Sequence, residues 1–197
     1  MARQPRTVPA RILDAAPGLA AERSWNTVSL ADIAGAAKVS LAQLHKAYPS
    51  KSAIVAGCMR RIDEQVLGAM DPSTLSEPVH DRLLDVLMRR LDRLAPHKAA
   101  VGSMLRGLSC DPVAALGLAP GFLESMAWTL EAAGIGSAGV GGRLRVKGLA
   151  AIHLSTFWVW LSDDSEDQSR TLATLDQRLR QAERLLSLLP DPVRAAS

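Results

Sequence analysis

The stretch "LADIAGAAKVSLAQLHKAYPSK", residues 30–51, contains two short helical patterns separated by a tight turn. Ile33 anchors the first pattern, Ala34 is the small residue where two helices can touch, and Leu44 is the inward residue of the second. Two helices that cross at a steep angle need small and apolar contacts on both sides of the turn. The stretch therefore predicts a helix-turn-helix.

Hydroxyl side chains stand where helix N-caps are needed, because a cap oxygen accepts a hydrogen bond from a free amide of the first turn. Thr7, Ser29 and Ser40 are the three candidates. They predict an opening helix that ends near residues 23–24, and the two helices of the motif over residues 30–37 and 41–47. With a fourth helix starting at Lys51, residues 1–51 are expected to form an N-terminal DNA-binding domain.

The remainder, residues 52–197, is expected to form a second, helical domain. Apolar residues recur at helical spacing throughout, and no strand pattern or internal repeat is present. Pro120-Gly121 is expected to interrupt one helix, and Ser165 with Gln168 is expected to form a capping box before the last helix. The chain is predicted to be all-α with about nine helices.

Composition places the chain in the cytoplasm. Its 197 residues are 48% hydrophobic, and its two cysteines match no metal or disulfide pattern. The N-terminus lacks the apolar core of a secretory signal, and the apolar run over residues 148–161 is shorter than a membrane span. We therefore expect a soluble protein without membrane contact.

Positive charge is concentrated at the N-terminus. Residues 1–62 hold nine basic and three acidic residues, whereas the other 135 hold 14 basic and 17 acidic ones. A basic domain on a mildly acidic body suits a polyanionic partner. An ordinary solvated surface explains the same charge.

From Arg11 to about Cys58 the sequence resembles the DNA-binding domain of the TetR family of transcriptional regulators. The resemblance rests on "ILDAA" at residues 12–16, "VSLADIA" at 28–34, "VS" at 39–40 and "YPSK" at 48–51. It implies a homodimeric regulator, by default a repressor, that binds a palindromic DNA operator and is released by a small apolar ligand. It also implies that residues 52–197 form a ligand-binding and dimerisation domain.

The resemblance also implies which residues meet DNA. Base contacts are expected from Leu41, Ala42, Gln43 and Ala47, and phosphate contacts from Ser29, Lys38, Ser40, His45, Lys46 and Lys51. Gln43 can pair with an adenine edge, and Leu41 and Ala42 can touch a thymine methyl group. Arg3 and Arg6 can add contacts from an N-terminal arm. The sequence departs from the family at Lys38, a turn position that usually holds a left-handed glycine, and at His45 and Ala47.

Two further sets of residues are assigned to the body of the protein. An apolar ligand pocket is expected from Met88, Met104, Leu108, Phe122, Met126 and Trp128, although each of these can simply fill the core. A leucine seam at heptad spacing ends the chain, and a dimer interface is expected from Trp158, Leu172, Leu175, Leu179, Ala182 and Leu186. The seam can instead close only the internal core.

Two rival readings remain. Residues 155–179 are also similar to TetR-fold lipid-binding proteins of ubiquinone biosynthesis, which do not bind DNA; the matches are Thr156, Asp164, Ser165, Asp167, Thr171, Leu175, Asp176 and Arg178. "GIGSAG" at residues 134–139 fits a dinucleotide-binding pattern, but that pattern needs a preceding strand. No catalytic set, metal site or cofactor site can be assembled, so we expect no enzyme activity.

Overall fold

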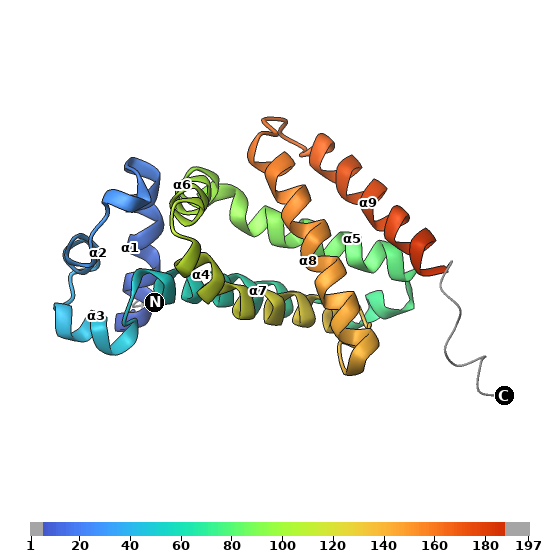
Figure 1. Cartoon of the computed structure of the whole chain (residues 1–197), viewed down its shortest axis with the longest axis horizontal. Helices are drawn as coiled ribbons and strands as arrows, with labels where there is room; N and C mark the ends of the chain where they lie inside the picture. Colours follow the sequence, from blue (N-terminus) through green and yellow to red (C-terminus); the bar gives the residue numbers. More distant parts are fainter. Residues whose placement is uncertain (1–5, 188–197) are drawn as a thin grey trace, which may run out of the picture. The chain divides into compact units, whose positions relative to one another are not determined.

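The fold is all-helical over residues 6–187, the part of the chain that this computed structural model describes (Figure 1). The α-helices are α1 (Val8–Glu22), α2 (Leu30–Ala37), α3 (Leu41–Ala47), α4 (Lys51–Leu67), α5 (Val79–Leu94), α6 (Lys98–Ser109), α7 (Pro112–Ala132), α8 (Gly139–Leu161) and α9 (Ser169–Ser187). Three 3-10 turns are interspersed, namely η1 (Trp25–Thr27), η2 (Pro72–Ser76) and η3 (Ala95–His97). No strand occurs in this described range, which confirms the predicted all-α class.

Two compact units make up the chain. Unit 1 contains the residues up to Gly68 together with Asp92–Ser125, and unit 2 contains Ala69–Leu91 together with the residues from Met126 onward. The boundary expected after residue 51 does not coincide with these units, because α6 packs against α1. The assignment of DNA binding to residues 1–51 and ligand binding to residues 52–197 stays a prediction about function.

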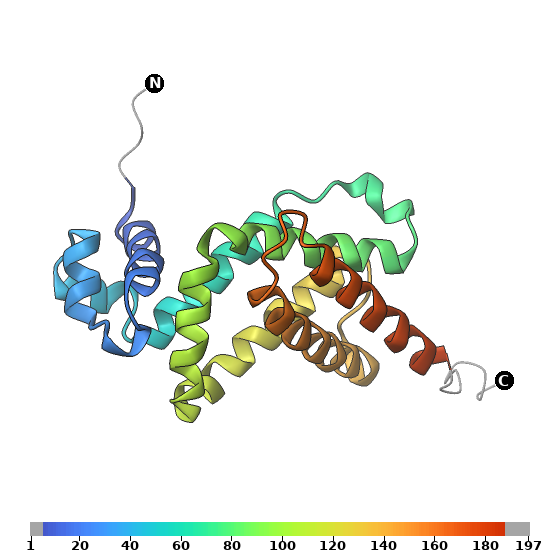
Figure 2. The same cartoon turned by 90° about the horizontal axis from the view of Figure 1, so that it is seen from above.

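Unit 1 is organised around α1, α2 and α3, which pack against one another (Figures 1 and 2). Thr7, Ser29 and Ser40 cap these three helices as predicted. Their inward side chains join one continuous core; its fully buried members include Ile12, Ile33, Leu44 and Ile54. Burying such side chains stabilises the fold by about 2 kcal/mol each.

Unit 2 contains an antiparallel hairpin of α8 and α9, which lie side by side in both views (Figures 1 and 2). Leu175 and Leu179 of α9 and Trp160 of α8 are buried. His80 of α5 bridges to α9, with Nε2 2.8 Å from Asp176 Oδ1 and Nδ1 3.3 Å from Glu183 Oε1. Because the two ring nitrogens face different carboxylates, this histidine serves as a bridge between the two helices.

Helix α7 corrects the expected interruption at Pro120-Gly121, because it runs unbroken from Pro112 to Ala132. A proline removes one helical hydrogen bond, and the remaining bonds of a long helix can hold the segment together. Pro120 and Gly121 are exposed, while Leu118 and Met126 are buried on either side of them. Packing on both sides thus outweighs the local break signal.

The capping box expected between Ser165 and Gln168 is also wrong. Ser165 Oγ instead donates to Asp163 Oδ1 at 2.6 Å, and Thr171 Oγ1 donates to Asp163 Oδ2 at 2.6 Å. These hydrogen bonds hold the pKa of the Asp163 carboxyl well below its usual range. The buried Asp163 carboxylate therefore organises the turn before α9, and Gln168 adopts a left-handed conformation with φ 52°.

One described helix, α7, is long and apolar enough by composition to cross a membrane. Core helices of soluble proteins pass the same test, and a proline lies near its middle. The length and apolar composition of α7 are therefore weak evidence for a membrane span.

Candidate nucleic-acid interface

Helix α2 is fixed at its N-terminus by a reciprocal capping box. Ser29 N donates to Asp32 Oδ2 at 2.8 Å, and Asp32 N donates to Ser29 Oγ at 3.1 Å. Arg23 Nη2 adds an ion pair at 3.0 Å. Chiefly through the hydrogen bonds from Ser29, the pKa of Asp32 is lowered to about 2, so the carboxylate stays charged at neutral pH. The start of α2 is therefore well defined.

The turn between α2 and α3 confirms the left-handed conformation expected at Lys38, which has φ 54° and ψ 43°. Its amide donates to the carbonyl groups of Ala34 and Gly35. Arg11 Nη2 of α1 donates to the Lys38 carbonyl oxygen, so α1 holds the turn in place. The sequence reading missed this role of Arg11, because the two residues are 27 positions apart.

Two substitutions at Lys38 are expected to separate backbone strain from charge. Lys38→Gly relieves about 1 kcal/mol of left-handed strain but makes the unfolded chain freer, so the free energy of unfolding should change by less than about 1 kcal/mol. Lys38→Gln keeps the strain and removes the charge. If Lys38 contacts phosphate, both should lower the slope of DNA affinity against salt by about one unit per protomer. Unchanged slopes in binding titrations would exclude that contact.

Helix α3 buries one side and exposes the other. Leu44 is buried, whereas Leu41 is 56% exposed and Lys46 is exposed. Ala42, Gln43 and His45 are also exposed, and Ala47 is half-buried. Ser40 N donates to Gln43 Oε1 at 2.9 Å, and Gln43 N donates to Ser40 Oγ at 3.1 Å. The helix thus has a short exposed face with a lysine and a histidine in its last turn.

Lys51 differs from the other predicted phosphate contacts. Its Nζ donates to the Trp25 carbonyl oxygen at 2.5 Å and lies 4.7 Å from the centroid of the Trp25 ring. Burial lowers the pKa of this ammonium group. Lys51 therefore ties the start of α4 to η1, and in this arrangement its charge serves a cation–π contact.

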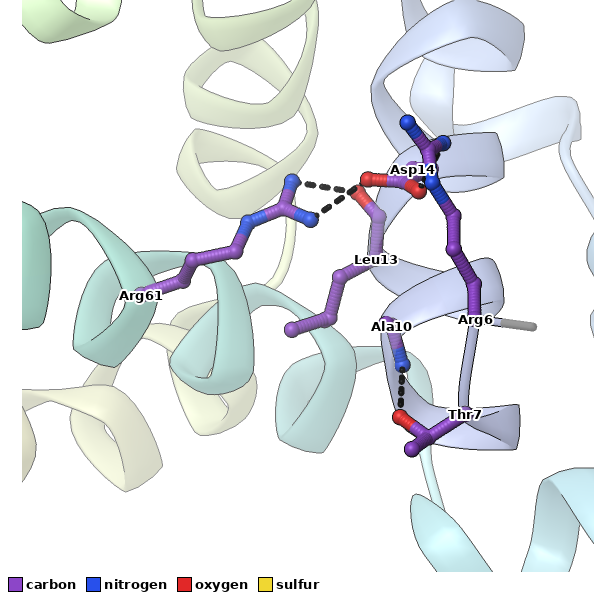
Figure 3. A network of polar contacts seen from close by, with 6 residues as sticks. All are labelled: Arg6, Thr7, Ala10, Leu13, Asp14 and Arg61. Carbon is purple, nitrogen blue, oxygen red and sulfur yellow. Dashed lines mark hydrogen bonds and ion pairs between the residues drawn. The ribbon is translucent and has the colours of Figure 1, made fainter. Parts of the chain in front are cut away.

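A second tie joins α4 to α1 (Figure 3). Arg61 Nη1 lies 2.7 Å from Asp14 Oδ1, and Arg61 Nη2 donates to the Leu13 carbonyl oxygen at 2.8 Å. Arg6 reaches the other side of the same carboxylate, with Nη1 2.6 Å from Asp14 Oδ2. Asp14 therefore connects the N-terminal segment, α1 and α4 in one polar network. Arg3, the other predicted arm residue, lies outside the described residues.

Helix α6 packs closely against the loop that follows α1. Ser103 Oγ accepts a hydrogen bond from Trp25 N at 3.0 Å and donates to the Arg23 carbonyl oxygen at 3.3 Å. A Cβ added at Gly107 would lie 2.8 Å from Asn26 Oδ1, so the helix approaches η1 as closely as a glycine permits. A movement of α6 would displace η1 directly.

The residues predicted to line a ligand pocket are divided between the two units. Met104, Leu108 and Phe122 belong to unit 1, where Met104 is buried in the core shared with α1–α3 and Leu108 packs against that core. Met88, Met126 and Trp128 belong to unit 2; Met126 is fully buried, and Trp128 is 53% exposed. Their role in ligand binding stays a prediction.

The predicted dimer residues have contrasting environments. Leu175 and Leu179 are buried within the chain, so they serve the core of the protomer itself. Trp158 and Leu172 are 54% and 40% exposed, Ala182 is half-buried, and the side chain of Leu186 lies outside what is described. An exposed stripe at heptad spacing occurs on α8 instead; it consists of Val140, Leu144, Lys147, Ala151, Leu154 and Trp158. We call it the α8 stripe.

Catalytic and metal chemistry finds little support in the described part of the chain. No group of three or more His, Cys, Asp or Glu side chains there could hold a metal ion. The "GIGSAG" segment joins α7 to α8, and its end residues, Gly134 and Gly139, have φ of 72° and 73°. It follows a helix, which leaves it without the strand that a dinucleotide loop requires.

Comparison with known proteins agrees with this geometry. Residues 12–58 match the family described as bacterial regulatory proteins, tetR family. A TetR transcriptional regulator from Nitrosomonas europaea superposes with a TM-score of 0.74 at 27% identity, covering 91% of this chain and 99% of that one. One from Rhodococcus sp. RHA1 superposes with 0.68 at 22%, covering 88% and 94%. No curated protein sequence matches significantly.

Proposed function

Because residues 12–58 form an N-terminal domain of the tetR family of bacterial regulatory proteins and the chain has the fold of TetR transcriptional regulators, we propose that it binds DNA and regulates transcription. The observation that carries the proposal is α3: its inward Leu44 is buried, and its remaining side chains face outward with Lys46 and His45 in the last turn. A helix held this way can enter the major groove. We propose repression, because it is the usual mode of regulation in this family.

The proposed DNA-binding species is a homodimer on a palindromic operator. A two-fold symmetric dimer places two recognition helices about one helical turn apart, so each reads one half-site. The α8 stripe supports this, because its exposed side chains, apart from Lys147, are apolar and lie at heptad spacing, which suits the pairing of two helices. We assign Trp158 and Leu172 to this interface.

Release from DNA is proposed to follow the binding of a small apolar effector to the body of the protein. An effector that binds the released conformation more tightly shifts the population toward it, with a coupling of about 1–3 kcal/mol. The family resemblance implies that α4 swings when the effector binds. The contacts of Ser103 and Gly107 with η1 allow a movement of α6 to contribute as well. The protein would act in the cytoplasm, with no cofactor and no enzyme activity.

Selection of bound duplexes from a randomised library tests the proposal. We expect enrichment of a palindrome bound at moderate salt. Lys46→Gln should lower affinity and reduce the salt slope by about one unit per protomer, because a phosphate contact is lost. Arg93→Gln, which removes an exposed cation from α5, is the matched control and should bind like the parent protein.

Failure to enrich any sequence, together with a weak affinity for DNA that does not change with salt concentration, would overturn the proposal. The TetR-fold lipid-binding reading would then be the one to pursue. It predicts a co-purifying isoprenoid lipid, detectable by mass spectrometry of the purified protein after organic extraction.

A further inference from the structure

Three polar side chains are buried in the core of unit 2. They are Arg90 of α5, which is 5% exposed, and His153 and Thr156 of α8, which are 3% and 1% exposed. We propose that they form a binding site for an anionic group, so that the effector is an amphipathic carboxylate rather than a wholly apolar molecule. The inference rests on the proposed control by an effector and deepens it.

The three side chains lie near one another. His153 and Thr156 are three positions apart on α8, so they share one face of that helix, and both are buried. Burial and, to a lesser degree, the positive charge of Arg90 lower the pKa of the His153 imidazole, which places the guanidinium group near this ring. The cluster therefore combines a positive charge, a neutral imidazole ring and a hydroxyl group.

The hydroxyl group of Thr156 is the member of the cluster that points most directly to a ligand. Thr156 Oγ1 makes no hydrogen bond to the described residues, although this side chain is 1% exposed. A buried hydroxyl group without a hydrogen bond destabilises a fold, because it has lost its contacts with water and gained none in exchange. A ligand oxygen that accepts a hydrogen bond from Thr156 would remove this cost.

The charge and the donors of the cluster select an anion. A guanidinium group has five N–H donors, so Arg90 can keep its contacts within the protein and still donate to a ligand. A carboxylate can accept from Arg90 and from the Thr156 hydroxyl, and hydrogen bonds to an ionised group are stronger than neutral ones. A cationic effector would be repelled by Arg90, and an effector without polar atoms would leave the Thr156 hydroxyl unsatisfied.

The core around the cluster suits the apolar part of such a ligand. Leu87 and Leu91 of α5 and Trp160 of α8 are buried, and Trp160 lies one turn beyond Thr156 on the same face of α8. Because all of these side chains are buried, a ligand reaches them only when α5 and α8 move apart. A carboxylate bound there therefore favours a different conformation of unit 2, which is the differential binding that an effector needs.

The test compares ligands that differ only in their head group. Straight-chain carboxylates from octanoate to tetradecanoate, and the primary alcohols of the same lengths, are titrated into the full-length protein at pH 7 by calorimetry, without DNA. We expect at least one carboxylate to bind about tenfold or more tightly than its alcohol, because hydrogen bonds to a charged group contribute more to affinity. The same carboxylate should weaken binding to the operator recovered by selection.

Two protein variants connect the preference to named side chains. Thr156→Val removes the hydroxyl group and keeps the shape, so affinity for the carboxylate should fall about tenfold while stability without ligand does not fall. Arg90→Gln should abolish the preference for the carboxylate over the alcohol. Arg89→Gln removes the same charge from the exposed neighbouring position and is the matched control, which should bind like the parent protein. If Arg90→Gln does not fold, Thr156→Val still decides the question.

Alcohols that bind as tightly as the carboxylates would overturn the proposal, as would the failure of every carboxylate to bind. A preference for carboxylates that Thr156→Val leaves unchanged would also overturn it, because the anion would then bind elsewhere. These titrations contain no DNA, so they test the anion site even if no operator is recovered and the proposed DNA binding fails. A carboxylate that binds at the cluster but leaves operator affinity unchanged would overturn the effector role.

Discussion

Lowering the pH from 7 to 5 is expected to reduce the free energy of unfolding of unit 2 by about 2 kcal/mol through His153 alone. This side chain of α8 is 3% exposed, and its ring centroid lies 5.6 Å from that of Phe157. Burial, with a further contribution from the positive charge of the buried Arg90, lowers its pKa to about 3. The folded unit therefore holds a neutral imidazole throughout the range in which most proteins are handled.

The sign follows from the two states. In the unfolded chain a histidine has a pKa of about 6.5, so it takes up a proton as the pH falls below that value, while the folded unit does not until about pH 3. The contribution of His153 to the free energy of unfolding is complete above about pH 6.5 and is lost progressively between pH 6.5 and pH 3. The loss is about 1.4 kcal/mol for each pH unit.

The measurement is urea unfolding at pH 7 and pH 5, followed by circular dichroism. His153→Gln serves as the control, because its amide does not titrate, and carboxylates that titrate near pH 4 contribute equally to both proteins. The parent protein should lose about 2 kcal/mol more than the variant over this interval. Equal losses would show that His153 accepts a proton in the folded unit.

Local signals in the sequence predicted unit 1 well. The caps at Thr7, Ser29 and Ser40 depend on residues within three positions, and the structure confirms them. The left-handed conformation of Lys38 could also be predicted from the sequence, since this residue lies between two short helices whose ends are marked by caps. These features follow from hydrogen bonds that the adjacent chain can make by itself.

Long-range contacts explain what sequence reasoning missed. Lys51 bonds to Trp25 across 26 positions, and Ser103 reaches Trp25 across 78. No periodic pattern marks such pairs. Asp163 is the same kind of case at shorter range, because its carboxylate accepts hydrogen bonds from Ser165 and Thr171, so the Ser165 hydroxyl does not form the expected box with Gln168. The residue types predicted a charged contact or a helix cap at these positions. Which residue each side chain contacts depends on how distant segments pack together.

The α9 seam shows that heptad periodicity does not by itself distinguish an interface from the core of the protomer. The heptad of leucines on α9 is conspicuous in the sequence, yet Leu175 and Leu179 are buried in the protomer. After Gly148, helix α8 is apolar on nearly every side, so the sequence alone does not distinguish its exposed apolar residues from its buried ones. Only the burial of one face, including Val146, Leu149 and Trp160, reveals that the opposite face is free of the protomer core.

Trp158→Arg is expected to convert the proposed dimer into a monomer and to weaken operator binding by about 10²- to 10⁴-fold. Trp158 is 54% exposed within the protomer and lies at the end of the α8 stripe, with Leu154 45% exposed and Leu144 59% exposed. Buried tryptophans at interfaces contribute 2 kcal/mol or more, and an arginine at the same place would lose water without gaining a partner. A monomer then contacts one half-site and loses the effective concentration that links the two recognition helices.

Sedimentation velocity and operator titration on the same samples check this expectation. Val113→Arg is the matched control, because Val113 is an 81% exposed apolar residue of α7 outside the stripe, and that variant should remain dimeric. The loss should be confined to palindromic DNA, since binding to a single half-site needs one protomer only. A Trp158→Arg protein that stays dimeric with full affinity would place the interface elsewhere. That other interface could not include Leu175 or Leu179, because both side chains are buried within the protomer.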